Sequence, residues 1–258
     1  MIGLSKRRLP FRLLALAVLT ICLSIISRNS NTPSARTNRQ PLPTATQRPI
    51  VTVQTQPDSP LLISSIRAFS SDPQNVDLIF DITNVSSKPI RVYAIKQELE
   101  VGGPGLSSVT LHNLDLANSL LQPGQSLTSV DTYEVVSDKQ QRLTLSVDYI
   151  EFIDGTKWGV DSVRSAERAA GQRAAAYALS KRLIKILTAG GPNNVMSAIE
   201  AGAAKIEPPA SRSDEWRAGF SQGSNFIVAR LKESHQKGGP EEVERKLRQF
   251  AEQFKGVD

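Results

Sequence analysis

Hydrophobic and polar residues alternate over residues 61–163, and turn signals divide this stretch into short runs. Leu78, Phe80 and Ile82 take every second position of one run, as in a strand with one buried face. Asp154-Gly155 is a dipeptide typical of hairpin turns. The runs predict seven strands, at residues 61–69, 76–83, 90–100, 109–114, 126–136, 143–152 and 156–160. This number and spacing are typical of an antiparallel β-sandwich of immunoglobulin type.

The sixth run changes phase within itself. Alternation extends from Leu143 to Tyr149 and then resumes in the opposite phase at Ile150 and Phe152. The change predicts a β-bulge or a strand that moves between sheets. Tyr149 and Trp158, on the two strands of the predicted hairpin, are the candidate binding residues, because cross-strand aromatic rings can form a platform for a ligand. The alternative is that both rings close one end of the sandwich core.

After residue 163 the period becomes helical. Apolar residues recur every three or four positions, as on the buried face of a helix. Three breaks divide the region, at Gly190-Gly191-Pro192, Glu207-Pro208-Pro209 and Gly238-Gly239-Pro240. Because glycine favours the end of a helix and proline its first position, residues 164–258 are predicted to hold three to four helices. The predicted fold class is therefore α+β.

The last helical stretch carries a narrow apolar stripe, made of Val243, Leu247, Phe250 and Phe254. Its opposite face is charged, and a helix of this length is marginal in water by itself. We expect the stripe to pack on the preceding helix, against Trp216, Phe220 and Ile227. The alternative is a free recognition surface, through which the helices would bind a protein partner or a second copy of the chain.

The first 60 residues differ from the rest. Lys6, Arg7 and Arg8 precede an uncharged apolar run from Leu13 to Ile26, which predicts a signal anchor or signal peptide over residues 1–27. Residues 28–60, rich in proline, serine and threonine, are predicted to form a disordered tether. The basic end should stay in the cytoplasm. This predicts a single-pass inner-membrane protein with its C-terminus outside the cytoplasm; the alternative is secretion after cleavage near Ser24 or Ser27.

The charge distribution argues against a nucleic-acid partner. The formal net charge is +6, but residues 1–60 hold eight basic residues and one acidic residue, so the predicted folded part is close to neutral. Such a part lacks the excess of positive charge that binding to phosphates requires. The single cysteine, Cys22, lies in the apolar run, so the predicted folded part has no disulfide.

Several patterns resemble chemical sites without meeting their requirements. His112 and His235 have no metal-ligand spacing. The Gly-x-Ser-x-Gly match at residues 219–223 lies within a helical pattern, whereas a nucleophile elbow needs a strand before it. Asp148, Glu151 and Asp154 could bind calcium, but a turn explains Asp154. The sequence therefore predicts no catalytic, cofactor-binding or metal-binding residue, and no small-molecule ligand.

The stretches VDLIFDITNVSSKPIRVYAIK, LQPGQS and LTLSVDYIEFIDGTKWG resemble the Ig-like or fibronectin-type-III-like modules of bacterial exported proteins. The resemblance covers residues 61–163 and implies a fold and an extracytoplasmic setting, but no active site. The expected function is that of a non-enzymatic module of the cell envelope, for binding or scaffolding. The alternative is a secreted enzyme, or a subunit of one, with a site between the sandwich and the helices.

Overall fold

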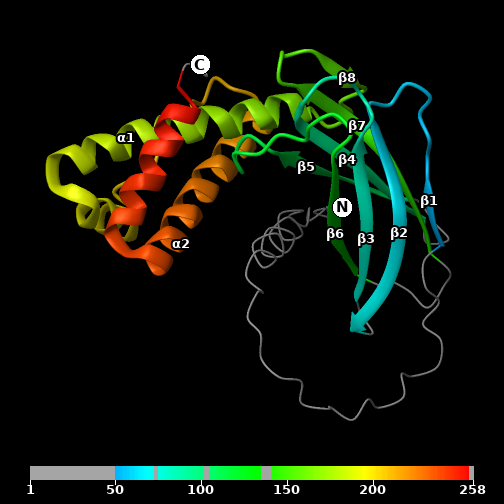
Figure 1. Cartoon of the computed structure of the whole chain (residues 1–258), viewed down its shortest axis with the longest axis horizontal. Coiled ribbons are helices and arrows are strands. Elements are labelled where there is room, and N and C mark those ends of the chain that lie inside the picture. Colours follow the sequence, from blue (N-terminus) through cyan, green and yellow to red (C-terminus); the bar gives the residue numbers. More distant parts are fainter. Residues whose placement is uncertain (1–49, 73–74, 101–104, 135–140, 256–258) are drawn as a thin grey trace, which may run out of the picture. The chain divides into compact units, whose positions relative to one another are not determined.

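The computed structural model describes residues 50–72, 75–100, 105–134 and 141–255 (Figure 1). The predicted leader and most of the predicted tether lie outside these residues. The described chain contains eight strands and two helices: β1 Ile50–Val53, β2 Leu61–Asp72, β3 Asn75–Asn84, β4 Ile90–Glu100, β5 Leu106–Asn113, β6 Ser126–Glu134, β7 Arg142–Phe152, β8 Lys157–Gly159, α1 Ser165–Glu200 and α2 Asp214–Gln253. The described residues belong to one compact unit.

The strands form two sheets. One has the order β1-β7-β4-β5, with β8 also paired to β7, and the other has the order β2-β3-β6. Apolar side chains from both sheets share one buried core, which includes Leu78 and Phe80 of β3, Ile95 of β4 and Leu145 of β7. We call these two packed sheets the sandwich.

The prediction of seven antiparallel strands is wrong in one respect. Residues 50–53, assigned to the tether, form the additional strand β1, which pairs in parallel with β7. Val51 and Val53 of β1 pack against the sandwich core, while Ile50 and Thr52 are exposed. This alternation of exposed and half-buried side chains is typical of a strand, and it allows even a segment of four residues to pair at the edge of a sheet.

The predicted bulge is present in β7. Tyr149 pairs with Ala94 and Val147 pairs with Ile95, so Asp148 is an extra residue without a partner on β4. The bulge places Val147 and Ile150 in the sandwich core and turns Tyr149 to the other face of the sheet. There Tyr149 joins Val92, Ala94 and Ala169 of α1 in a separate buried cluster.

The prediction of three to four helices is also wrong, because the structure has two helices of 36 and 40 residues. Each helix contains one non-helical residue, Gly191 (φ 77°) in α1 and Gly239 (φ 68°) in α2. Glycine adopts positive φ without steric cost, and the proline that follows each one is suited to the first turn of a helix. Each Gly-Gly-Pro sequence therefore produces a kink within its helix.

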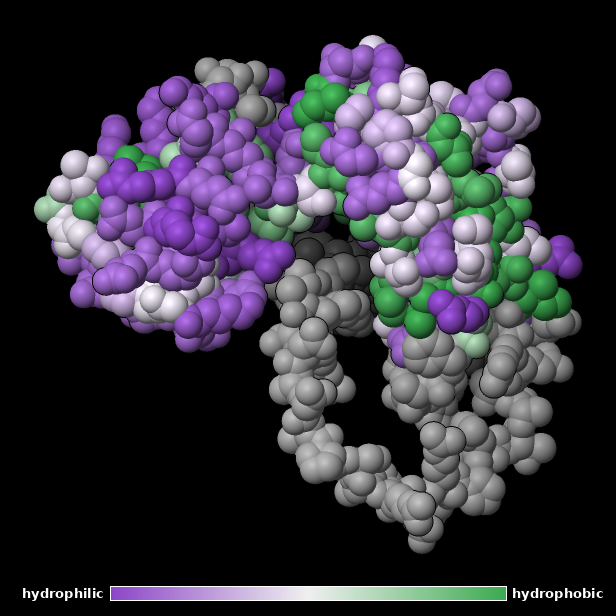
Figure 2. Space-filling view, in the orientation of Figure 1, coloured by the Kyte–Doolittle hydropathy of each residue, from purple (hydrophilic) through white to green (hydrophobic). Residues whose placement is uncertain are grey.

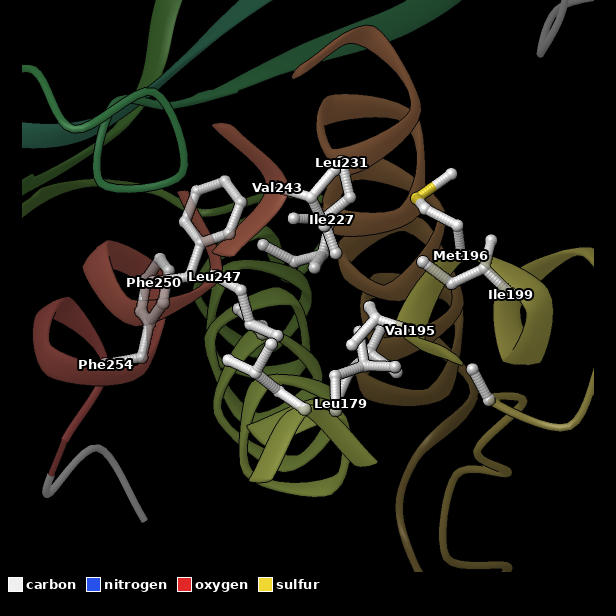
Figure 3. Packing of buried hydrophobic residues seen from close by; sticks show 14 of the residues in the cluster. Leu179, Val195, Met196, Ile199, Ile227, Leu231, Val243, Leu247, Phe250 and Phe254 are labelled. Carbon is white, nitrogen blue, oxygen red and sulfur yellow. The ribbon is translucent and has the colours of Figure 1, made fainter. Parts of the chain in front are cut away.

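The two helices enclose a core of their own (Figure 3). The C-terminal stripe of α2 is part of it, since Val243 and Leu247 are fully buried and Phe250 and Phe254 nearly so. The same core contains Ile227 and Leu231 of α2. Docking of the stripe is thus confirmed, but Trp216 and Phe220 are not among its partners in this core; these two rings stack on each other.

Candidate functional site

A polar cluster occupies part of the sandwich interior, on the side where the edge strands β5 and β6 lie. Gln97 of β4 is only 6% exposed although it is an amide, and it pairs with Ser108 of β5. His112 of β5 pairs with Tyr93 of β4, whose ring belongs to the sandwich core. On β6, Asp131 pairs with the buried Leu78 and so shares the inner face of the smaller sheet.

Hydrogen bonds from Gln97 connect the two sheets through this cluster. Its Nε2 donates to Oδ2 of Asp131 at 2.7 Å and to Oγ1 of Thr110 at 3.3 Å. Its Oε1 accepts from the Ser108 hydroxyl at 3.2 Å. Among the described residues no cation pairs with the Asp131 carboxylate, which is held instead by this amide.

The titratable groups of the cluster have shifted pKa values. Burial raises the pKa of Asp131 to about 6, although the hydrogen bond from Gln97 acts in the opposite direction. Burial lowers the pKa of His112 to about 4, so its imidazole is neutral at neutral pH. The pKa of Tyr93 is raised by burial and by the nearby charge of Asp131. A group of shifted titratable residues is characteristic of functional sites, although structural networks can produce one as well.

His112 also has an unused hydrogen-bonding atom. Its ring stacks on Tyr93, with 4.5 Å between the ring centroids and an angle of 15° between the planes. Part of the residue remains exposed, but Nε2 is buried and has no hydrogen-bond partner in the described part of the chain. The cluster therefore contains a buried imidazole nitrogen without a hydrogen-bond partner among the described residues, and a carboxylate held by an amide and not by a cation.

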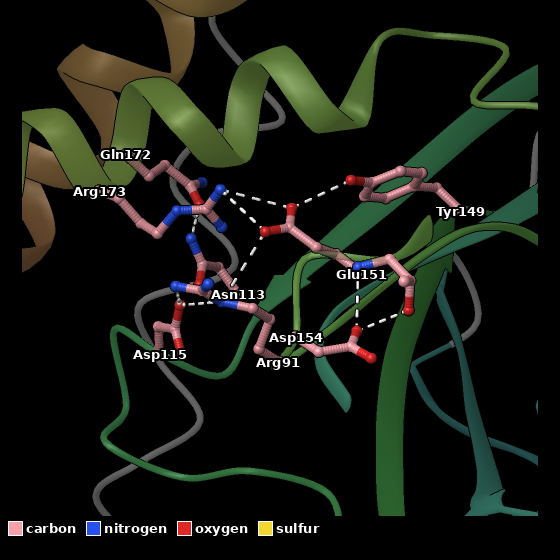
Figure 4. A network of polar contacts seen from close by, with 9 residues as sticks. Arg91, Asn113, Asp115, Tyr149, Glu151, Asp154, Gln172 and Arg173 are labelled. Carbon is pink, nitrogen blue, oxygen red and sulfur yellow. Dashed lines mark hydrogen bonds and ion pairs between the residues drawn. The ribbon is translucent and has the colours of Figure 1, made fainter. Parts of the chain in front are cut away.

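A second polar network connects the sandwich with α1 (Figure 4). Oε1 of Glu151 lies 3.0 Å from Nη2 of Arg173, and Oε2 of Glu151 accepts a hydrogen bond of 3.0 Å from the Tyr149 hydroxyl. Arg91 donates from Nε to Asp115 at 2.7 Å and lies 3.8 Å from Glu151. Both carboxylates are paired with guanidinium groups, which makes this network a structural connection between the sheet and the helix.

The candidate calcium ligands are separated by the fold. Asp148 accepts a hydrogen bond from the backbone N–H of Ser162, and Glu151 belongs to the network of Figure 4. Asp154 forms an ion pair with Lys88, and this contact lowers its pKa. Within the described ranges no group of three or more potential ligands could hold a metal ion.

The candidate aromatic platform does not form. Tyr149 is 2% exposed and lies beneath α1, in the cluster that the bulge created. Trp158 pairs with Ile150 and packs, half-buried, against the sandwich core. The two rings lie on opposite faces of one sheet, so the structure does not bring them to a common surface.

The Gly-x-Ser-x-Gly match has an explanation in helix packing. A Cβ atom at Gly219 would lie 2.0 Å from the backbone oxygen of Arg168, and one at Gly223 would lie 2.3 Å from that of Gln172. Glycine at both positions lets the backbones of α1 and α2 touch. Ser221, between them, is exposed and donates to the carbonyl of Arg217. His235 lies two turns further along α2 than Ile227, in the same helix.

A hollow of about 470 Å³ lies between the loop that follows β5 and the end of α2. Its lining includes Arg91, Asp115, Ile153 and Phe254. The charges of Arg91 and Asp115 are used in their mutual ion pair. The amide of Gln253 donates to the backbone oxygen of Asp115 across the hollow's edge. Arg91, Asp115 and Gln253 thus contact one another, whereas Oε1 of Gln253 is buried without a hydrogen-bond partner in the described part of the chain.

Sequence reasoning missed Gln97 and Asp131 as site residues and set His112 aside. One signal was present for Gln97, because it interrupts the apolar positions Tyr93, Ile95 and Leu99 of its strand. No comparable signal exists for Asp131, because both faces of β6 carry polar residues.

Comparison with known protein families finds no matching family, and no curated protein sequence matches this chain. In the part of the chain that the structure describes, neither helix is apolar over a length that could cross a membrane.

Proposed function

We propose that this chain is a non-enzymatic interaction module of a bacterial cell envelope. In this proposal the apolar run from Leu13 to Ile26 anchors it in the inner membrane, and the folded part is displayed outside the cytoplasm. The sandwich, Ig-like in the resemblance given above, is the binding part. Helix α1 packs on the outer face of its larger sheet, through Ala169.

The hydrogen bond between Gln97 and Asp131 is the observation that carries this proposal. It lies inside the sandwich, where two apolar side chains of similar volume would be expected to be as stable or more stable. Residues that reduce stability are retained where function requires them. The cluster also lies between two edge strands, β5 and β6, where an approaching partner would meet it.

The distribution of apolar surface supports a partner on the sandwich. The exposed large hydrophobic residues of the described chain all belong to its β-rich part: Ile50, Leu62, Val85, Leu106, Ile153 and Val160. Figure 2 shows mainly hydrophilic residues over the helices on the face drawn and green patches over the strands. The apolar stripes of α1 and α2 are used in their own core, which leaves the sandwich as the better candidate surface.

The proposal is tested with the double variant Gln97→Leu, Asp131→Leu of the full-length chain. We expect its melting temperature to stay the same or rise, because a buried polar pair is replaced by apolar side chains. We expect it to lose at least one partner that the unchanged chain retains when both are purified from the native envelope by an affinity tag.

A matched control is Thr144→Ala, on the outer face of the larger sheet and away from β6. It removes the hydrogen bond between the hydroxyl groups of Thr144 and Thr52 but leaves the interior unchanged. This control should keep all partners. If the double variant is equally well folded and also keeps every partner, the polar cluster is not the binding site.

A further inference from the structure

The two edges of the smaller sheet differ in regularity. The register of β2 on β3 shifts twice, after Ser64 and after Phe69, and Ser65 has a positive φ of 53°. The register of β6 on β3 is unbroken over nine residues, from Ser126 to Glu134. Irregular edges resist pairing with another strand, whereas a regular edge invites it. In the described chain β6 has β3 as its only neighbour, so one side of β6 is free.

The hydrogen-bonding groups of the free side can be assigned from the start of the strand. The backbone N–H of Asn84 donates to the carbonyl of Gln125, so this pair is hydrogen-bonded. Hydrogen-bonded and non-hydrogen-bonded pairs alternate along an antiparallel ladder. Leu127, Ser129 and Asp131 therefore bond to β3, whereas Thr128, Val130 and Thr132 direct their N–H and C=O groups toward the free edge.

The sequence of β6 is nearly symmetric about Val130. In an antiparallel pairing of two copies of β6 centred on Val130, Thr128 of one copy faces Thr132 of the other, and the two Val130 residues face each other. Pairs of β-branched residues on one face stabilise such a ladder. On the inner face Ser129 of one copy faces Asp131 of the other, which places a hydroxyl donor opposite the carboxylate.

The edge of the larger sheet at β5 is less accessible than the edge at β6. Strand β5 ends the larger sheet, but its outward residues Val109 and Leu111 pack into the cluster beneath α1. A strand added at that edge would meet α1. On the outer face of β6, by contrast, no described residue belongs to any of the three buried clusters.

From these observations we propose that β6 is a self-association edge, at which two copies of this chain pair antiparallel about Val130. The pairing joins two three-stranded sheets into one continuous sheet with two-fold symmetry. This inference rests on the proposed function, because it identifies a second copy of the chain as a partner that binds on the side of the sandwich where the polar cluster lies. It places Asp131 of the polar cluster directly at the interface.

Cysteine crosslinking of the purified full-length chain in detergent, in a Cys22→Ser background, tests the register. Val130→Cys should give a disulfide-linked dimer on mild oxidation, because residues facing each other in a hydrogen-bonded pair have Cα atoms about 5.5 Å apart. Ile79→Cys is the control, because Ile79 pairs with Val130 on the same face but lies one strand further from the edge. Two Ile79 residues would be about 14 Å apart across the dimer, beyond disulfide reach.

A backbone variant tests the hydrogen bonds themselves. Val130→Pro removes an N–H from the free edge but none from the pairing with β3, and proline is tolerated at such edge positions. The two-fold dimer loses one hydrogen bond from each copy, so we expect dimerisation to weaken by about 10- to 100-fold in analytical ultracentrifugation. Val130→Ala, which loses side-chain packing but keeps the N–H, should weaken it much less. If Val130→Pro does not fold, the crosslinking decides.

A full-length chain that stays monomeric at high micromolar concentration, or that crosslinks as efficiently through Ile79→Cys as through Val130→Cys, overturns self-association through β6. These outcomes are separable from failure of the proposed function. A monomeric chain whose Gln97→Leu, Asp131→Leu variant loses an envelope partner leaves the proposed function standing. A dimer with the expected crosslink, together with a double variant that keeps every partner, refutes the proposed site and leaves the dimer standing.

Discussion

Glu151 of β7 and Arg173 of α1 form an ion pair between the sandwich and the helices, and both side chains are at least 90% buried. The bulge at Asp148 allows it, because Tyr149 turns outward beside Glu151 and donates its hydroxyl to the same carboxylate. The pair connects the strands, in which apolar residues take every second position, with the helices, in which they recur every three or four positions. The stability of each part should therefore depend on the other.

Arg173→Met should destabilise the protein by about 3–5 kcal/mol, because it leaves the Glu151 carboxylate buried without its main counter-ion. Chemical denaturation followed by circular dichroism measures this change. Arg248→Met is the control, since Arg248 pairs with Glu244 on an exposed helix face and such pairs contribute at most about 0.5 kcal/mol. Equal losses in the two variants would show that the buried pair has no special role.

Gly219→Ala and Gly223→Ala should each destabilise the protein by about 1–3 kcal/mol or more, because the added methyl group meets the backbone of α1. Ser221→Ala changes the residue between them and should alter stability by less than about 0.5 kcal/mol. Thermal unfolding of the three variants compares these effects. A loss of stability in Ser221→Ala as large as in the two glycine variants would contradict this packing role of the glycines.

The contributions of Asp131 and His112 to stability should largely cancel between about pH 4 and 6, because the two groups act in opposite directions. The folded-state pKa of Asp131 is about 6, against 3.8 ordinarily, so its contribution is fully present below pH 4 and is lost as the pH rises through 6. The folded-state pKa of His112 is about 4, against 6.5, so its contribution is fully present above pH 6.5 and is lost as the pH falls through 4.

Single variants should separate the two contributions. In Asp131→Asn only His112 remains, and stability should rise with pH over this range. In His112→Gln only Asp131 remains, and stability should fall as the pH rises. Urea denaturation at about pH 4.5 and about pH 6 measures both slopes. Slopes of the same sign in the two variants would contradict the assigned pKa shifts.

Residues 44–163 alone should be less stable than residues 44–258, and more prone to aggregate. The alternation of the strands alone predicts that residues 58–163 fold independently. The structure argues against it, because removal of α1 exposes Val92, Ala94 and Tyr149 and leaves Glu151 without Arg173. Hydrogen exchange of the two fragments compares their protection. Equal protection of the strands in both would show that the helices contribute nothing to the sandwich.

Part of the candidate site could be predicted from sequence. Gln97 interrupts a row of apolar positions in its strand, which is a visible sign of a buried polar group. Asp131 gives no such sign, because polar residues occupy both faces of β6. Its place in the site depends on the pairing of β6 with β3 and on the packing of one sheet over the other. Both are contacts between residues far apart in the chain.

The sequence by itself determined the features that depend on neighbouring residues: the strand period, the bulge in β7 and the buried stripe of α2. Only the tertiary structure decided that β1 joins β7, that the helices kink at Gly191 and Gly239, and that Glu151 meets Arg173. The reason is physical. Periodicity and capping are set by free energies within a few residues, whereas these outcomes depend on packing between segments that the sequence places far apart.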